Sequence, residues 1–229
     1  NGRGLAISHD GDTVAIGSRR NSPGGYGTRQ YFGHVRIFDW NGSAWIQRGI
    51  DIDGEEVREY FGYGLDMSND GNTVAIGGYR HDGNGEYSGR VSMYDWNGSA
   101  WIQRGLDIYG EAQGDKAGGY KDVSMSDDGD TVAIGAKLND GNGINSGHVR
   151  IFDWNGSAWI QRGLDMQGET AYDTASYVSM SDDGDTVAIG SLRNDDLEWR
   201  SERDGPVIYC DNSDGAMGPD PVLEDFGFG

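Results

Sequence analysis

Several residue types are scarce in this sequence, and each scarcity narrows the classes of protein it can encode. Among 229 residues there are four prolines and a single cysteine, Cys210. One cysteine cannot form an intramolecular disulfide, so the chain has no disulfide framework. Lysine occurs only at Lys116, Lys121 and Lys137. No apolar run approaches the roughly 20 residues of a membrane-spanning helix, so direct membrane insertion is not expected.

The charge balance excludes two further kinds of partner. Aspartate and glutamate total 38 against 18 lysines and arginines, which gives a net charge of −20. A charge of this sign repels phosphate backbones and anionic lipid surfaces, so we expect no nucleic-acid partner. The acidic, lysine-poor composition suits a protein secreted into salty water. Glycine, by contrast, supplies 40 residues, and this abundance favours short strands joined by many turns.

Two phrases recur along the chain and define its organisation. The first, Asp12–Gly17, reads Asp-Thr-Val-Ala-Ile-Gly and returns in three further copies: Asn72–Gly77, Asp130–Gly135 and Asp185–Gly190. The second, Phe38–Gly49, returns as Tyr94–Gly105 and Phe152–Gly163, and Gly205–Asp211 is its nearest remnant in the last copy. These offsets predict four tandem units with the bounds 1–60, 61–118, 119–173 and 174–225.

Each unit is predicted to contain four short antiparallel strands, because apolar residues alternate between turn residues. In the second unit we expect strands at Gly64–Ser68, Thr73–Gly77, Arg90–Asp95 and Ala100–Asp107. Asp-Gly and Asn-Gly pairs between them tolerate positive φ and close tight hairpins. Gly77 and its counterparts leave room for close approach of a neighbouring sheet. The sequence therefore predicts an all-β protein of four-stranded blades.

The repeats resemble the FG-GAP family, whose best-known members form the β-propeller heads of integrin α chains. The resemblance rests on Phe61-Gly62 at the start of the second unit and on Ala75-Ile-Gly-Gly78 after a hairpin. The third and fourth units carry Gly119-Tyr120 and Thr174-Ala175 where the family has Phe-Gly. The resemblance implies a β-propeller. Family propellers usually have seven blades, so four blades form either a small closed ring or an arc completed by more chain or by another copy.

The repeat symmetry and the resemblance together imply an extracellular binding, adhesion or scaffold module. We expect its partners to be a protein or glycan at the cell surface, or further copies of the chain itself. Catalysis is not expected, because the sequence shows no Ser-His-Asp spacing and no Cys/His cluster. His34 and His148 share one repeat position with Arg90, which indicates a polar surface position. An enzyme built on the propeller, acting on glycans, is a remaining alternative, and only Asp195–Asp214 could hold its unique site.

The resemblance also implies calcium, which the family binds in oxygen-rich loops between the second and third strands. Here the corresponding loops are Asp82–Glu86 and Asn139–Gly143. The candidate ligands in these two loops are Asp82, Asn84, Glu86, Asn139, Asp140 and Asn142. Neither loop supplies the full family spacing, and ordinary Asx and glycine turns explain the same residues.

Two other features of the second phrase have both structural and functional interpretations. Tryptophans flank each Asn-Gly hairpin, and Trp45, Trp101 and Trp159 are candidates for stacking on sugar rings in a lectin-like propeller. Cross-strand pairing of the tryptophans explains the same pattern without a ligand. The hairpins also carry Asn-Gly-Ser sequons that would be N-glycosylated in a secreted eukaryotic protein, at Asn41, Asn97 and Asn155. Asn-Gly turn chemistry alone accounts for these residues as well.

Overall fold

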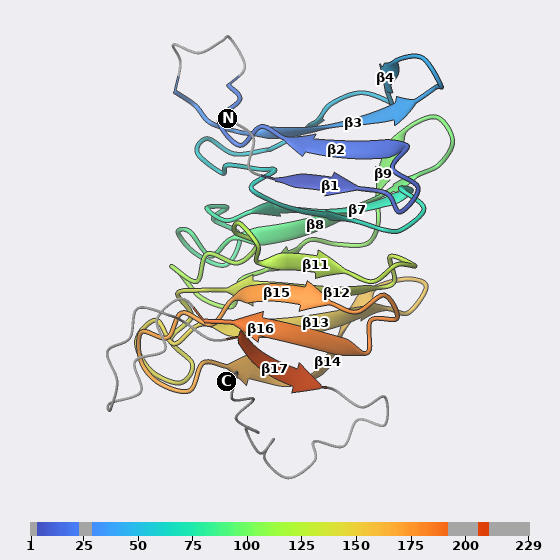
Figure 1. Ribbon diagram of the computed structural model, residues 1–229. Helices are drawn as coiled ribbons and strands as arrows, with labels where there is room; N and C mark the ends of the chain where they lie inside the picture. Colours follow the sequence, from blue (N-terminus) through green and yellow to red (C-terminus); the bar gives the residue numbers. More distant parts are fainter. Residues whose placement is uncertain (1–3, 23–28, 192–205, 211–229) are drawn as a thin grey trace, which may run out of the picture.

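The fold is all-β, and its sheets follow one another along the chain. The computed structural model describes residues 4–22, 29–191 and the backbone of residues 206–210, and every regular element in these residues is a β-strand. The strands form four antiparallel sheets that stack in chain order (Figure 1). No helix with the length and hydrophobicity of a membrane span occurs in the described residues. The predicted class, all-β with antiparallel blades, is confirmed.

Each sheet draws its strands from one copy of the repeat. The first contains β1 (Leu5–Ile7), β2 (Thr13–Gly17), β3 (His34–Trp40), β4 (Trp45–Gln47) and β5 (Ile52–Asp53). The second contains β6 (Gly64–Met67), β7 (Thr73–Gly78), β8 (Arg90–Trp96), β9 (Trp101–Gln103) and β10 (Ile108–Tyr109). The third contains β11 (Val123–Met125), β12 (Thr131–Ala136), β13 (His148–Trp154) and β14 (Trp159–Gln167). The fourth contains β15 (Tyr177–Met180), β16 (Thr186–Gly190) and β17 (Pro206–Cys210), which pairs with β16.

The Asp-Gly hairpin between the first two strands is held by its own side chains. In the second blade, Ser68 Oγ donates to Asp70 Oδ1 at 2.7 Å, and the same carboxylate accepts the amide of Asn72 at 2.9 Å. Gly71 adopts a φ of 69°, which favours glycine. These bonds satisfy the turn completely, so the acidic pattern of this hairpin has a structural explanation.

The outer strand of the second blade differs from the predicted Ala100–Asp107. It runs as β9, leaves the ladder and resumes as β10, and both segments pair with β8. Gly105 between them has a φ of 75°, which directs the chain out of the ladder. In the third blade, β14 spans the same region as one strand, with a register shift opposite Val149 and Ile151. The repeat therefore encodes a bulge in its outer strand.

An isolated parallel bridge joins each blade to the start of the next. Gly33 bridges to Phe61, and the corresponding pairs are Gly89 with Ala117 and Gly147 with Ala175. The structural equivalents of Phe61 are therefore Ala117 and Ala175. They differ from Gly119 and Thr174, the positions where the sequence comparison of the repeats places the phenylalanine. The space that a phenylalanine fills in one blade is left to smaller side chains in the others.

The blades approach each other at backbone distance, as Gly77 predicts. A Cβ atom on Gly77 would overlap the carbonyl oxygen of Gly118 in the next blade. Gly17 and Gly135 meet the next blade in the same way. Apolar side chains then fill each interface. Between the second and third blades, for example, Met93 belongs to one buried cluster with Val132.

Polar contacts repeat at each interface between blades. An arginine after the outer strand donates to the carbonyl of the Asp-Gly turn in the following blade, as Arg48 does to Gly71 at 2.8 Å. Arg104 and Arg162 make the equivalent bonds to Gly129 and Gly184. The turns themselves are linked through backbone bonds, such as Asn69 N to Asp127 O at 2.8 Å. The recurring arginine of Gln-Arg-Gly is thus explained by contacts between blades.

The first and fourth sheets lie at opposite ends of the stack (Figure 1). Three apolar side chains on the outer face of the first sheet are exposed: Leu5 by 67%, Ile7 by 62% and Ile16 by 38%. Their equivalents in the second blade, Leu65, Met67 and Ile76, are 9%, 6% and 0% exposed because the first blade covers them. The described blades therefore form an open stack whose first sheet has no neighbour on one side.

Candidate functional site

A buried basic residue begins the third strand of each of the first three blades. The three are His34, Arg90 and His148, and all are buried. Each follows a glycine with positive φ that has no space for a Cβ atom beside the next blade: Gly33, Gly89 and Gly147. The glycine fixes the strand start at the blade boundary, so the following side chain points inward. The prediction of a polar surface position is wrong, because the bridge to the next blade closes over this position.

Acidic residues surround this position in each of the first three blades, and two places in the repeat supply most of them. One is the aspartate just beyond the Gln-Arg-Gly of the second phrase, and its three copies are Asp51, Asp107 and Asp165. The other is the glutamate two residues after the last strand of the preceding blade, represented by Glu55 after β5 and Glu111 after β10. The sequence alone does not link these acids to the basic position, because 17 or more residues separate them along the chain.

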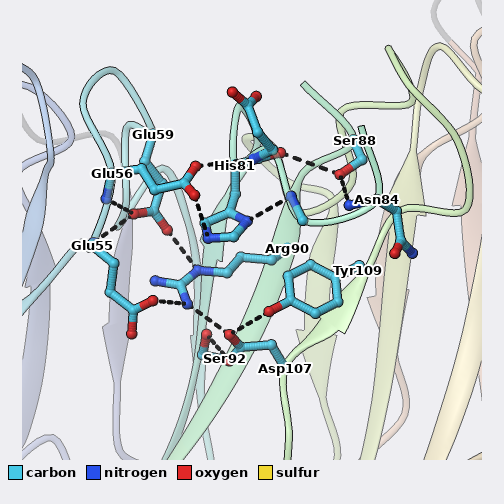
Figure 2. Close-up of polar contacts among 12 residues, drawn as sticks. Glu55, Glu56, Glu59, His81, Asn84, Ser88, Arg90, Ser92, Asp107 and Tyr109 are labelled. Atoms are coloured by element: carbon cyan, nitrogen blue, oxygen red, sulfur yellow. Dashed lines mark hydrogen bonds and ion pairs between the residues drawn. The ribbon is translucent and has the colours of Figure 1, made fainter. Parts of the chain in front are cut away.

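In the second blade the basic residue is an arginine enclosed by three carboxylates (Figure 2). Arg90 Nε donates to Glu59 Oε1 at 2.6 Å, and its Nη1 lies 2.6 Å from Asp107 and 3.1 Å from Glu55. Glu59 is fully buried, and its second oxygen accepts the amides of Glu55 and Glu56. Burial acts to lower the pKa of Arg90, but the charges of Glu59 and Asp107 outweigh it and the pKa lies above its ordinary value.

In the third blade a histidine takes the place of the arginine. His148 Nδ1 lies 3.8 Å from Glu111 Oε2 and 3.8 Å from Asp165 Oδ2, which is beyond hydrogen-bonding distance. Neither ring nitrogen has a hydrogen-bond partner within the described part of the chain. Burial lowers the pKa of His148 to about 4, aided by the charge of Arg150, so the imidazole is neutral at pH 7.

The first blade also has a histidine at this position, but its ring is engaged. His34 Nδ1 lies 2.6 Å from the side-chain amide of Asn21 and 3.4 Å from Asp51. Asp51 in turn accepts hydrogen bonds from Nε and Nη2 of Arg36. Burial lowers the pKa of His34, opposed by the charge of Asp51. One repeat position therefore carries three different arrangements of charge, and only the third blade leaves its ring nitrogens unpaired.

The loops predicted to bind calcium form contacts of their own. Asn84 and Asn142 donate their side-chain amides to the carbonyls of Gly110 and Gly168, which follow the outer strand of the same blade, both at 2.9 Å. The side-chain nitrogen of each asparagine is therefore bonded to the protein itself, and the bond holds the loop against the segment after the outer strand.

The aspartates of the same loops accept backbone amides within their own turn. Asp82 Oδ1 accepts from Tyr87, and Asp140 Oδ1 accepts from Asn145. Asn139 Oδ1 accepts the amide of Gly141, and the Glu86 carboxylate forms no hydrogen bond with the described part of the chain. These are Asx-type turns that need no ion. Calcium binding by the two loops stays a prediction.

The tryptophans pair across the outer hairpin. Trp40 lies opposite Trp45 in the strand register, with ring centroids 5.6 Å apart. The pairs of the second and third blades, Trp96 with Trp101 and Trp154 with Trp159, have centroids 5.4 Å apart. The cross-strand pairing expected from the sequence is present in all three blades.

Two of the three candidate stacking tryptophans also contact the preceding blade. Trp101 Nε1 donates to the carbonyl of Arg48 at 3.0 Å, and Trp159 Nε1 donates to that of Arg104 at 2.9 Å. Each arginine also places its guanidinium over the tryptophan pair. Trp45 belongs to the first blade, where no described blade precedes it, and is exposed.

This difference gives a matched prediction for stability. We expect Trp101→Ala to lower the free energy of unfolding by about 2–3 kcal/mol, less than for a fully buried tryptophan, because it removes ring packing and an inter-blade hydrogen bond. Trp45→Ala makes the same chemical change without those contacts and should cost less than about 1 kcal/mol. Urea unfolding at low protein concentration measures both. Equal losses would contradict the assigned role.

The three sequon asparagines lie at exposed hairpin tips. The side-chain oxygen of Asn41 accepts the amides of Ser43 and Ala44, at 3.0 and 2.9 Å. Asn97 and Asn155 make the same bonds in their blades. The turn uses the amide oxygen and leaves the nitrogen toward solvent. N-glycosylation at these residues stays a prediction.

A groove along the inner strands was not predicted. Its volume is about 580 Å³, and its lining includes Tyr63, Tyr120 and Tyr177 together with Lys121. The tyrosines lie just before or at the first strand of successive blades, and rings of Tyr63 and Tyr120 stack with centroids 5.8 Å apart. Planar or sugar-like ligands favour such surfaces. A tyrosine at or just before the first strand of the second, third and fourth blades is the sequence signal that could have located it.

Comparisons with known proteins identify the fold. No protein-family model and no curated protein sequence matches this sequence. The β-propeller domain of the Trilobed protease from Pyrococcus furiosus, described as having an open velcro topology, is similar with a TM-score of 0.51 and 13% identity, over 92% of this chain and 55% of that chain. A candidate 6-phosphogluconolactonase from Bacteroides uniformis has a TM-score of 0.50 at 13% identity, over 91% of this chain and 54% of that chain.

A third similar structure is acylaminoacyl peptidase from Pyrococcus horikoshii, with a TM-score of 0.47 and 13% identity over 90% of this chain and 30% of that chain. The chain thus spans about half, or less, of the length of these proteins. Together with the stacked antiparallel sheets, the likeness to the Trilobed protease propeller defines the class: the chain has a β-propeller fold. The predicted fold class is confirmed.

The expectation that the chain is not an enzyme is wrong. It rested on the view that similar blades without a distinctive site indicate binding alone. Proteins with this fold include the propeller of a protease and a candidate lactonase, so the architecture occurs in enzymes. At 13% identity the likeness shows the fold and assigns no reaction to this chain. Of Asp195–Asp214, where a unique site was considered, only the backbone of residues 206–210 belongs to the described residues.

Proposed function

We propose that the chain is an extracellular binding and scaffold module of FG-GAP-like blades, and that its first blade packs against a blade of another copy. The observation that carries this proposal is the exposed apolar face formed by Leu5, Ile7 and Ile16. In the second and third blades the same three repeat positions are buried beneath the preceding blade. Since a neighbouring blade covers these positions within the stack, a blade of another copy is the partner that fits this face best.

The hollow over this face supports the same partner. It has a volume of about 590 Å³ and is lined by apolar residues of β1 and β2 with Phe38 and Trp45. Apolar patches of this kind on soluble proteins mark interaction sites. Trp45 corresponds to Trp101 and Trp159, whose Nε1 atoms donate to carbonyls of the preceding blade. A blade placed before the first one would offer Trp45 Nε1 the same kind of acceptor.

The far end of the stack offers the complementary surface. Gly190 corresponds to Gly77, yet a Cβ there would meet nothing closer than Tyr177 Cβ at 3.3 Å. Ala188 is half-buried, whereas its equivalents Ala75 and Ala133 are fully buried. Within the described residues, the fourth blade thus has an unfilled contact position where the first blade of another copy would sit. Such head-to-tail contacts give rings when the rotation closes and filaments when it does not.

The extracellular setting is part of the proposal. It is supported by the resemblance to FG-GAP repeats, by the net charge of −20 and by the exposed position of the three sequons. A module of this kind would present its loops and inner groove to a protein or glycan at the cell surface while its ends associate.

Sedimentation velocity over a range of concentrations tests the association. We expect the wild-type chain to sediment as a concentration-dependent oligomer and Ile16→Asp to sediment as a monomer, because the carboxylate would be buried without a partner. Ile102→Asp places the same charge on β9, where Ile102 is 51% exposed, and should behave as wild type. A wild-type chain that remains a sharp monomer at every concentration would refute the proposal.

A further inference from the structure

The third blade contains a buried histidine whose ring forms no hydrogen bonds within the described residues. His148 is 0% exposed, and both of its ring nitrogens lack hydrogen-bond partners among the described residues. A buried polar group without a partner costs free energy, so such groups usually mark an ion, a water molecule or a functional role. The Nδ1 atom points at two carboxylates, Glu111 and Asp165. The imidazole is too far from either carboxylate to hydrogen-bond to it, but the spacing of the three side chains suits three ligands around one ion.

The neighbouring blades show what this position requires. In the second blade a guanidinium cation, Arg90, lies among the carboxylates and bonds to them directly. In the first blade Arg36 binds Asp51, and Asn21 lies against the histidine ring. The third blade keeps the acids but replaces the buried arginine with a neutral imidazole. The third blade therefore has no cation at the position that the Arg90 guanidinium occupies in the second blade.

Arg150 is the remaining positive group near this cluster, and it does not fill the position. Its Nη1 lies 3.7 Å from Glu111 Oε1, whereas His148 lies near the other oxygen, Oε2. The Nη2 of Arg150 donates to the carbonyl of Tyr109. Glu111 Oε2 therefore remains directed at the imidazole. Arg150 partly balances the charge of Glu111 without entering the space between Glu111, His148 and Asp165.

We propose that Glu111, His148 and Asp165 bind a divalent transition-metal ion of the Zn²⁺ class. The three ligand atoms lie within 4.8 Å of one another, and both nitrogen-to-oxygen distances are 3.8 Å. Ligands about 2.1 Å from a tetrahedral ion are roughly 3.4 Å apart, so small side-chain movements close the site. Glu111 is 44% exposed and free to make such a movement.

The ligand chemistry selects this class of ion. Imidazole suits zinc and its neighbours, whereas calcium and magnesium prefer sites made only of oxygen. Three protein ligands leave a fourth position for water or for an acidic group of a partner. Glu111 follows β10 of the second blade, while His148 and Asp165 belong to the third, so the ion would cross-link two blades. This site is independent of the association between copies.

Zinc binding to the metal-stripped full chain tests the proposal. Isothermal titration with Zn²⁺ in a buffer containing millimolar Mg²⁺, which occupies non-specific acidic sites, should show one saturable site per chain. Glu111→Gln should weaken it by about ten-fold or more, and His148→Gln should abolish it. The first variant changes a half-exposed residue and retains the fold, which circular dichroism verifies. His34→Gln alters the matching histidine of the first blade and should leave the affinity unchanged.

X-ray absorption of the zinc-loaded chain supplies a second readout and should show one imidazole among oxygen ligands. The proposal is overturned if the wild-type chain binds no zinc at a stoichiometry near one. It is also overturned if Glu111→Gln and His148→Gln, both folded, keep the wild-type affinity, since the cluster would then hold only water.

Discussion

Arg90→Met is expected to lower the free energy of unfolding by about 3–5 kcal/mol, among the largest effects of a single substitution in this chain. The substitution retains the volume of the side chain and removes its charge. Glu59, which is fully buried and bonded to Arg90 Nε, would be left as an uncompensated carboxylate. Removing one member of a buried ion pair costs more than the pair contributes, because the partner stays buried.

Two variants separate this explanation from general damage to the core. Arg36→Met removes an arginine whose side chain is 48% exposed and should cost at most about 1 kcal/mol. Adding Glu59→Gln to Arg90→Met should recover part of the loss, since the orphaned charge is then absent. Chemical denaturation monitored by tryptophan fluorescence measures all three. A loss for Arg90→Met no greater than that for Arg36→Met would show that the buried cluster contributes little.

Gly77→Ala is the second substitution with a large expected effect. Its Cβ would overlap the carbonyl oxygen of Gly118, and a backbone atom cannot move aside as a flexible side chain does. The second and third blades would have to separate, disturbing the cluster around Met93 and Val132. We expect a loss of about 3 kcal/mol, at the upper end of the range for overpacking. At about 2–4 °C for each kcal/mol, the melting temperature should fall by roughly 6–12 °C.

Gly190→Ala provides the matched control in the same chain. Gly190 occupies the same repeat position, but no described blade follows it, and the nearest atom to a new Cβ lies at 3.3 Å. The substitution should lower the melting temperature by less than half of the Gly77→Ala change in a dilute sample. Scanning calorimetry compares the two. Similar losses would mean that the glycine serves its own strand and not the approach of the next blade.

The sequence predicted the elements of the fold because their signals are local. Alternating apolar residues and Asp-Gly turns determine strands and hairpins within about ten residues, and four copies of Thr-Val-Ala-Ile-Gly place them in register. The close approach at Gly77 was also predictable, since a conformationally ordinary glycine in a strand indicates a tight neighbour. The outer strand was less predictable, because the bulge at Gly105 depends on pairing with β8 and not on the periodicity of its own residues.

The buried charge position was not predictable from a single repeat. His34, Arg90 and His148 look like variable surface residues in the sequence, and their acidic neighbours come from the outer strand and from the segment that leads to the next blade. Only the stacking of blades brings Glu111 to His148. The tryptophans show the same limit: pairing within a hairpin is a local property, whereas the bond from Trp101 to Arg48 exists because two blades pack together.

Carbene footprinting with mass spectrometry tests the central claim, that the exposed face of the first blade receives a blade from another copy. It compares the labelling of Ile16 with that of Ile76, its buried equivalent, as protein concentration rises. The account predicts that Ile16 is labelled in dilute solution and becomes protected to the level of Ile76 as the chain associates. Labelling of Ile16 that stays high at every concentration would contradict it.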